Sequence, residues 1–169
     1  MSRDKKFKFK KEKPEYDQKL LDLARVTRVV KGGRRFRFRA TIVIGNRKGR
    51  VGVGVGKGSD VSDAMKKAFD DAKKHLVTVS TSANTISHEI FFKQGSAKIM
   101  LKPAKIGRGI VAGGAVRAVV EFSGIKDIVS KSLGTSNKLN VARATAEALR
   151  SLRPESERRV VSEKKEEKK

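Results

Sequence analysis

Glycine and valine alternate through the stretch "RVGVGVG", residues 50–56. Successive side chains of a β-strand point to opposite faces, so the valines of such a strand share one face and the other face carries no side chain. A strand face made of glycine lets a helix or another backbone approach very closely. The stretch therefore predicts a strand that packs at short distance against a neighbouring element.

The residues around this stretch complete a unit of strands and one helix. Upstream, the sequence predicts a strand at residues 23–30, a turn at "KGG" and a strand at residues 36–44, which "GNRKG" joins to the glycine strand as a hairpin. Downstream, apolar residues recur at helical spacing from residue 61 to residue 76, with Ser59 or Asp60 as the N-cap. We expect a three-stranded antiparallel sheet plus one helix.

A second unit follows the short linker "STSANT". "ISHEIFF" and "AKIMLKPA" flank "KQGS" as a hairpin, a glycine-rich loop leads into a helix expected at residues 110–122, and "IKDIVSKSL" and "LNVARATAEALRSL" predict a strand and a last helix. The order of this unit is β-α-β-α, and the fold class is α+β. The predicted parts are a basic disordered arm at 1–19, an N-terminal domain at 20–85, a C-terminal domain at 86–152 and a disordered tail at 153–169.

Positive charge lies in two zones of the chain, whose formal net charge is +23. Eleven Lys or Arg and no acid stand between Leu23 and Ser59, and six and no acid between Ile90 and Val120, whereas residues 60–89 sum to −1 (four Lys, five acids). Charge zoned in this way indicates a polyanion, either nucleic acid or an anionic membrane surface. No apolar run approaches the roughly 18 residues of a spanning helix, and the N-terminus has no apolar signal core. We expect no membrane and a nucleic acid as the partner.

The residue types argue against an enzyme. Without cysteine there is no disulfide, zinc knuckle, thiol nucleophile or iron–sulfur site. The two histidines, His75 on the polar side of a predicted helix and His88 in a predicted strand, are interpreted as unremarkable surface or strand residues. No catalytic residue, metal site or cofactor is predicted, and the cytoplasm is the expected compartment.

The stretch "GVGVGKGS" at 52–59 also fails as a nucleotide-binding loop. A P-loop needs the pattern GxxxxGK[ST]. With its GK aligned on Gly56 and Lys57, the pattern requires a glycine at position 51 and a serine or threonine at position 58, but the chain has Val51 and Gly58. The dinucleotide pattern GxGxxG fails because Ser59 stands where its last glycine belongs. A structural glycine strand, packed on a helix or on an RNA backbone, is the interpretation we favour.

Arginine and apolar residues alternate in the second predicted strand, where Arg35, Arg37 and Arg39 interleave with Phe36, Phe38, Ala40, Ile42 and Ile44. This alternation predicts an apolar face in the core and a basic face toward a partner. Arginine suits phosphates through its bidentate fork, and Gly32-Gly33 let the preceding loop approach a phosphate chain.

A second candidate site is "GRGIVAGGAV" at 107–116. Glycines before a helix leave free N–H groups that bind phosphate readily, or they permit close helix packing, and both interpretations stay open. The predicted contacts to RNA are Arg25, Arg28, Lys31, Gly32, Gly33, Arg34, Arg35, Arg37, Lys57, Arg108 and Arg117, foremost those from 31 to 35.

Four segments in series resemble the bacterial small-subunit ribosomal protein S5 family: "VVKGGRRFRF", "GNRKGRVGVGVGKG", "GRGIVAGGAVRAVVEFSGI" and "KSLGTSNKLNVARAT". The resemblance covers about Leu20 to Leu152. It implies an N-terminal domain related to the double-stranded-RNA-binding fold and a C-terminal β-α-β-α domain of the S5 domain-2-like type, with an unusual crossover hand. The chain departs from the family at Val53 and Val55, where aromatics are frequent, and at Lys138, where proline is common.

The resemblance also implies partners. These are small-subunit rRNA, with ribosomal proteins S4 and S8 as neighbours and mRNA near the region where it enters the subunit. The loop matching residues 31–35 would reach rRNA near the spectinomycin site, and the family is linked to subunit assembly and decoding accuracy.

We therefore predict a non-catalytic structural component of the small ribosomal subunit, monomeric within the ribosome, that neutralises phosphates and recognises RNA shape. A free RNA chaperone or an RNA-processing subunit is the alternative.

Overall fold

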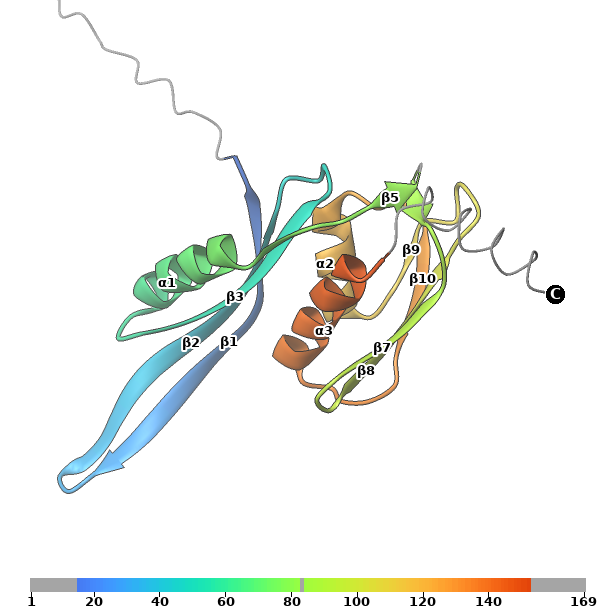
Figure 1. Cartoon of the computed structure of the whole chain (residues 1–169). Helices are drawn as coiled ribbons and strands as arrows, with labels where there is room; N and C mark the ends of the chain where they lie inside the picture. The colour runs from blue at the N-terminus through green and yellow to red at the C-terminus, as the bar shows by residue number, and fades with distance from the viewer. Residues whose placement is uncertain (1–14, 83, 153–169) are drawn as a thin grey trace, which may run out of the picture.

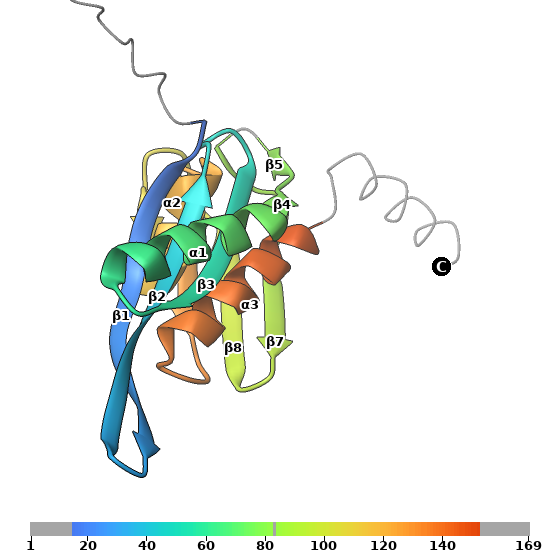
Figure 2. The same cartoon turned by 90° about the vertical axis from the view of Figure 1, so that its left-hand side faces the viewer.

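Four layers of secondary structure make up the computed structural model, which describes residues 15–82 and 84–152. Helix α1 (Val61–Lys74) covers one face of an N-terminal sheet, α2 (Gly114–Ser123) and α3 (Lys138–Arg150) form the next layer, and a C-terminal sheet closes the far side (Figure 1). Figure 2 looks through the same layers from the side of α1. No helix within the described ranges is long and apolar enough to cross a membrane.

The N-terminal sheet has four antiparallel strands in the order β1-β2-β3-β4. The strands are β1 (Asp17–Val30), β2 (Gly33–Gly45), β3 (Arg50–Gly58) and β4 (Leu76–Thr78). The predicted hairpins and helix are confirmed. Strand β1 begins earlier than the predicted residue 23, and β4 was not predicted because only three residues follow the helix before the chain leaves the sheet.

The C-terminal sheet has the order β7-β8-β10-β9. Its strands are β7 (Ile90–Gln94), β8 (Ala97–Pro103), β9 (Ile110–Val111) and β10 (Ile128–Ser132). Strand β9 pairs in parallel with β10, so the first residues of the helix expected at 110–122 belong to the sheet, and α2 starts only at Gly114. The predicted linker contains a two-stranded hairpin of β5 (Thr81–Ser82) and β6 (Thr85–Ile86), and His88 lies in a bend before β7 rather than in a strand.

The glycine face of β3 packs directly on the backbone of α1. A Cβ built on Gly54 would lie 2.2 Å from the carbonyl oxygen of Ala68, and those on Gly52 and Gly56 would meet carbonyl oxygens of the same helix at 2.5 and 2.3 Å. Real Cβ atoms essentially never approach so closely, so each of these positions requires glycine. The buried residues of the helix are small as well: Ala64, Ala68 and Ala72.

The opposite face of the N-terminal sheet is buried too, against α2 and α3. Val43, Val51 and Val53 belong to the same hydrophobic core as the C-terminal domain. Thr41 and Val43, the residues that follow Arg39 on the same face of β2, are therefore fully covered, which was not predicted. The physical reason is that a sheet buried on both sides reads as a continuous apolar run, here "ATIVIG".

Backbone contacts fasten the two domains together. The N–H of Arg47 in the β2–β3 turn donates to the carbonyl of Phe122 at 3.1 Å, and that of Gly49 to the carbonyl of Ser123 at 2.9 Å. Gly124, which ends α2, has a φ of +92° and would place a Cβ 2.3 Å from the Arg47 carbonyl oxygen. These contacts fix the N-terminal sheet on the C-terminal helices.

Candidate RNA interface

Strands β1 and β2 continue past the end of the sheet as a two-stranded ribbon, seen at the lower left of Figure 1. Val30 pairs with Gly33, so the ribbon turns over Lys31 and Gly32 alone. A Cβ on Gly32 or Gly33 would meet no described atom within 4 Å, and the φ of Gly33 is +135°. The tip is therefore open, and its left-handed backbone at Gly33 is one that glycine adopts without strain.

One face of the ribbon brings together four of the predicted contact residues, Arg28, Arg35, Arg37 and Lys57. Arg28 stands directly opposite Arg35, and Val26 opposite Arg37. Residues directly opposite each other in an antiparallel pair share a face, so these side chains lie together. They line a groove of about 470 Å³, here called the ribbon groove, whose residues are Val26, Thr27, Arg28, Val30, Arg35, Arg37 and Lys57.

Like charges face each other across this ribbon. Arg28 pairs with Arg35, and Arg39 pairs with Lys57 across β2 and β3. Like charges directly opposite in a sheet are destabilising. Among the residues that the structure describes, no carboxylate lies within 4.0 Å of the charged groups of Arg28, Arg35 or Lys57. The groove thus holds concentrated positive charge that the described part of the chain does not neutralise.

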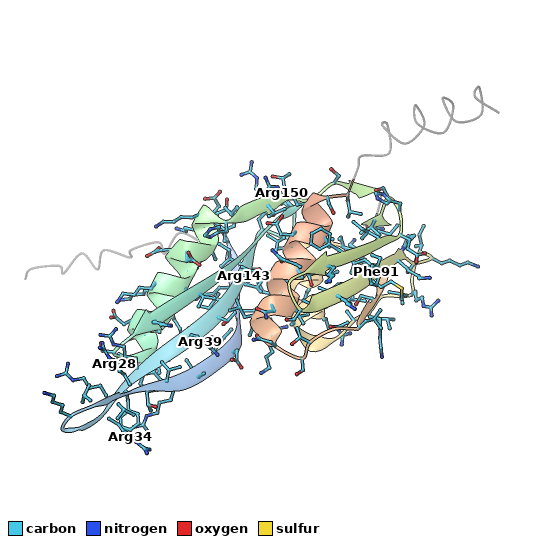
Figure 3. The ribbon with its side chains drawn as sticks, turned by 60° about the horizontal axis from the view of Figure 1, so that its bottom comes forward. Arg28, Arg34, Arg39, Phe91, Arg143 and Arg150 are labelled. Carbon is cyan, nitrogen blue, oxygen red and sulfur yellow. The ribbon has the colours of Figure 1, made fainter. Side chains whose placement is uncertain are left out.

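The other face of the ribbon corrects one prediction. Phe36 was assigned to the core, but it is 45 % exposed, and the guanidinium of Arg25 lies 3.6 Å from the centre of its ring. Phe38 packs at the edge of the core, and Ile42 and Ile44 are buried as predicted. The alternation of β2 continues into the ribbon, beyond the core beneath α1, and there the guanidinium of Arg25 stacks on the Phe36 ring. Figure 3 shows Arg34 at the exposed end of the ribbon.

Arg39, which the list of predicted contacts omits, has a structural position at the base of the ribbon. Its Nη2 lies 3.9 Å from Oδ2 of Asp22, whose Oδ1 accepts a hydrogen bond from Nζ of Lys138 at 3.1 Å. Asp22 therefore connects the ribbon to the start of α3. Sequence reasoning missed Asp22 because no local pattern says that it meets a residue so far along the chain.

The remaining predicted residues, Arg108 and Arg117, lie in the C-terminal domain and do not line the ribbon groove. Arg108 is exposed in the loop before β9, and Nη2 of Arg117 donates to the carbonyl of Ile110 at 3.2 Å. A Cβ on Gly113 or Gly114, at the start of α2, would meet no described atom within 4 Å. Close packing therefore does not explain these two glycines.

The apolar floor of the groove was also missed. Val26, Arg28 and Val30 stand at every second position of β1, so they share one face of the strand. This spacing of two was the feature of the sequence that could have revealed the floor. In the sequence these valines read simply as part of an apolar strand, because only the pairing with β2 shows that they lie beneath the arginines of the ribbon.

Comparison with known proteins identifies both domains. A family model described as "Ribosomal protein S5, N-terminal domain" matches residues 16–80, and one described as "Ribosomal protein S5, C-terminal domain" matches residues 92–160. Two similar proteins, each named small ribosomal subunit protein uS5, come from Campylobacter jejuni strains 81-176 and 81116. Each is 53 % identical over 139 residues, which is 82 % of this chain and 95 % of the relative.

Proposed function

The chain belongs to the ribosomal protein S5 family, and we propose that its ribbon groove and ribbon tip hold rRNA phosphates in the small ribosomal subunit. As a family member it is a structural, RNA-binding component of the cytoplasmic ribosome and not an enzyme. The fold is the two-domain α+β architecture that the resemblance implied. The relatives give no support to a free chaperone or a processing subunit.

The observation that carries the proposal is the set of like-charge pairs across the ribbon. Folding brings Arg28 against Arg35, and no carboxylate of the described residues pairs with either of them, which costs free energy in the isolated protein. A phosphate bound in the groove would attract both guanidinium groups and so outweigh the repulsion between them. A guanidinium binds a phosphate through two parallel N–H donors. Contacts of this kind fix position without reading sequence, as suits a protein that recognises folded RNA by shape.

The proposed contact residues fall into three groups. The groove contributes Arg28, Arg35, Arg37 and Lys57, and Arg25 lies on the opposite face of the ribbon. The tip contributes Lys31, Gly32, Gly33 and Arg34, where the open backbone leaves room for an RNA strand. Arg108 and Arg117 are proposed as a separate contact on the C-terminal domain.

Finer parts of the role are proposals as well. We propose ribosomal proteins S4 and S8 as protein neighbours, and mRNA near the region where it enters the subunit. The exposed apolar residue Ile106 (85 %), near Arg108, is suited to a protein contact. We further propose that the domain boundary falls between residues 85 and 86, inside the β5–β6 hairpin region.

The salt dependence of binding tests the proposal. Arg35→Gln with Arg37→Gln is expected to lower the slope of log affinity against log salt by roughly 1.4 to 1.8, at 0.7 to 0.9 for each lost phosphate contact. The measurement is binding of the full chain to deproteinised small-subunit rRNA over a series of salt concentrations.

The control is Lys66→Gln with Lys74→Gln, which removes the same charge from the exposed side of α1 and should leave the slope nearly unchanged. Equal slopes for both double variants would contradict the assignment of phosphates to the groove.

A further inference from the structure

Within residues 15–82 and 84–152, no element covers one face of the C-terminal sheet. Its inner face, with Ile99, Leu101 and Ile128 fully buried, packs on α2 and α3. Its outer face points away from the rest of the molecule, on the side where Figure 3 labels Phe91. None of the residues on this outer face was among the predicted contacts to RNA.

Strand pairing sorts the residues of the outer face into rows. Phe91, Met100 and Lys131 stand opposite one another across three strands. Lys93 stands opposite Lys98 in the next row, and on the other side Lys102 stands beside Val129, which is opposite Val111. Phe91 is 59 % exposed, an unusual position for a large aromatic ring. We call this set the outer face: Phe91, Lys93, Lys98, Met100, Lys102, Val111, Val129 and Lys131.

The charge on the outer face is almost entirely positive. Glu89, at its edge, forms an ion pair of 3.0 Å with Lys102. Within the described ranges, no carboxylate lies within 4.0 Å of Nζ of Lys93, Lys98 or Lys131. Lys93 and Lys98 are directly opposite, the same destabilising arrangement as in the ribbon. These three lysines therefore have no neutralising carboxylate among the described residues.

We propose that the outer face binds an unpaired segment of RNA, with a base stacked on Phe91 and the flanking phosphates on Lys93, Lys98 and Lys131. An exposed aromatic ring on a sheet, surrounded by cations, is the arrangement by which several RNA-binding sheets hold single strands. A duplex cannot use the ring, because the faces of its bases are already stacked. Met100, beside the ring, extends the apolar contact for the base.

A protein partner fits the outer face less well. The centres of protein–protein interfaces are depleted of lysine. Here Phe91 lies on the edge strand β7, and unpaired lysines stand on that strand and on the next two strands of the sheet. A buried contact would have to supply a carboxylate for each unpaired lysine. An RNA strand supplies one phosphate per nucleotide without any special sequence.

This inference goes beyond the ribbon site, because the two surfaces lie on opposite sides of α2 and α3. Figure 3 shows Arg34 and Phe91 at opposite ends of the molecule. A variant of one surface therefore leaves the other intact. Failure of the outer face in the following test would not affect the proposal for the ribbon.

The test compares two outer-face variants of the full chain on about 12 nucleotides of single-stranded RNA of mixed sequence and on the corresponding RNA duplex. Phe91→Ala is expected to weaken binding of the single strand by about fivefold or more, with little change in salt slope and no change for the duplex. Lys93→Gln with Lys98→Gln and Lys131→Gln is expected to lower the single-strand salt slope by roughly 2. The control is Lys66→Gln with Lys67→Gln and Lys74→Gln on α1, which should change neither quantity.

A protection experiment identifies the occupant. Lysine acetylation is measured on the protein alone, bound to deproteinised small-subunit rRNA, and assembled into the subunit. Protection of Lys93, Lys98 and Lys131 by rRNA alone is the expected result. Protection that appears only in the assembled subunit would mean that a protein covers the face, and no protection in either state would mean that the face stays in solvent. Either of these two outcomes overturns the inference.

Discussion

Gly54→Val is expected to destabilise the protein by about 3 kcal/mol or more, the largest effect on stability that we predict for a single substitution. The first side-chain atom would lie 2.2 Å from the carbonyl oxygen of Ala68 and 2.3 Å from the backbone nitrogen of Ala72. Both neighbours are helix backbone, which cannot rotate away as a flexible side chain can. Relief requires that α1 move off the sheet, which opens the core of Ile42 and Ile44.

Thermal or denaturant unfolding of the purified chain measures this effect. Gly32→Ala is the matched control, since a Cβ there meets no described atom within 4 Å, and its stability should stay within about 1 kcal/mol of the original. If Gly54→Val unfolded at the same denaturant concentration as the unmodified protein, the close contact between β3 and α1 would be wrong.

Arg28→Glu with Arg35→Glu is expected to reduce affinity for deproteinised small-subunit rRNA by about a hundredfold or more. The two residues are opposite each other in the ribbon groove, so both proposed phosphate contacts are lost. A hydrogen bond to a charged group contributes roughly 1.5 to 3 kcal/mol, and two such losses combine to at least that factor. The introduced carboxylates also repel the phosphates.

The same variant should keep its fold. Both positions are exposed, so we expect the free energy of unfolding to change by no more than about 0.5 kcal/mol per substitution. No gain in stability is expected, because the two opposed glutamates repel each other as the two arginines did. Lys66→Glu with Lys74→Glu changes the charge by the same amount on α1. Comparable loss of affinity in that control would attribute binding to net charge and not to the groove.

Local patterns in the sequence were sufficient for most of the architecture. Alternating glycine in β3 predicted a close neighbour, and the apolar spacing of the following segment identified that neighbour as a helix. The three hairpins, β1–β2, β2–β3 and β7–β8, followed from turn residues between predicted strands. These features depend on contacts between residues close in sequence, which a single sequence records well.

The errors arose where distant segments decide the environment. The burial of Val43 beneath α2 and α3 was not predicted, because nothing local in the sequence shows that these helices cover it. Phe36 was placed in the core because its alternation continues beyond the reach of α1. Ile110 was placed in a helix, although the partner that makes it a strand is β10, much later in the chain. The outer face escaped notice for the same reason, since its rows exist only once strands are paired.

Cleavage of rRNA from the ribbon tip tests the central claim most directly. The chain has no cysteine, so Gly32→Cys carries a single thiol at an open position, to which a tethered iron chelate can be attached. In the complex with deproteinised small-subunit rRNA we predict strong hydroxyl-radical cleavage at a compact group of nucleotides, lost when Arg28→Glu and Arg35→Glu are added. Cleavage no stronger than that from a chelate at Lys66→Cys on α1 would contradict the placement of the ribbon against rRNA.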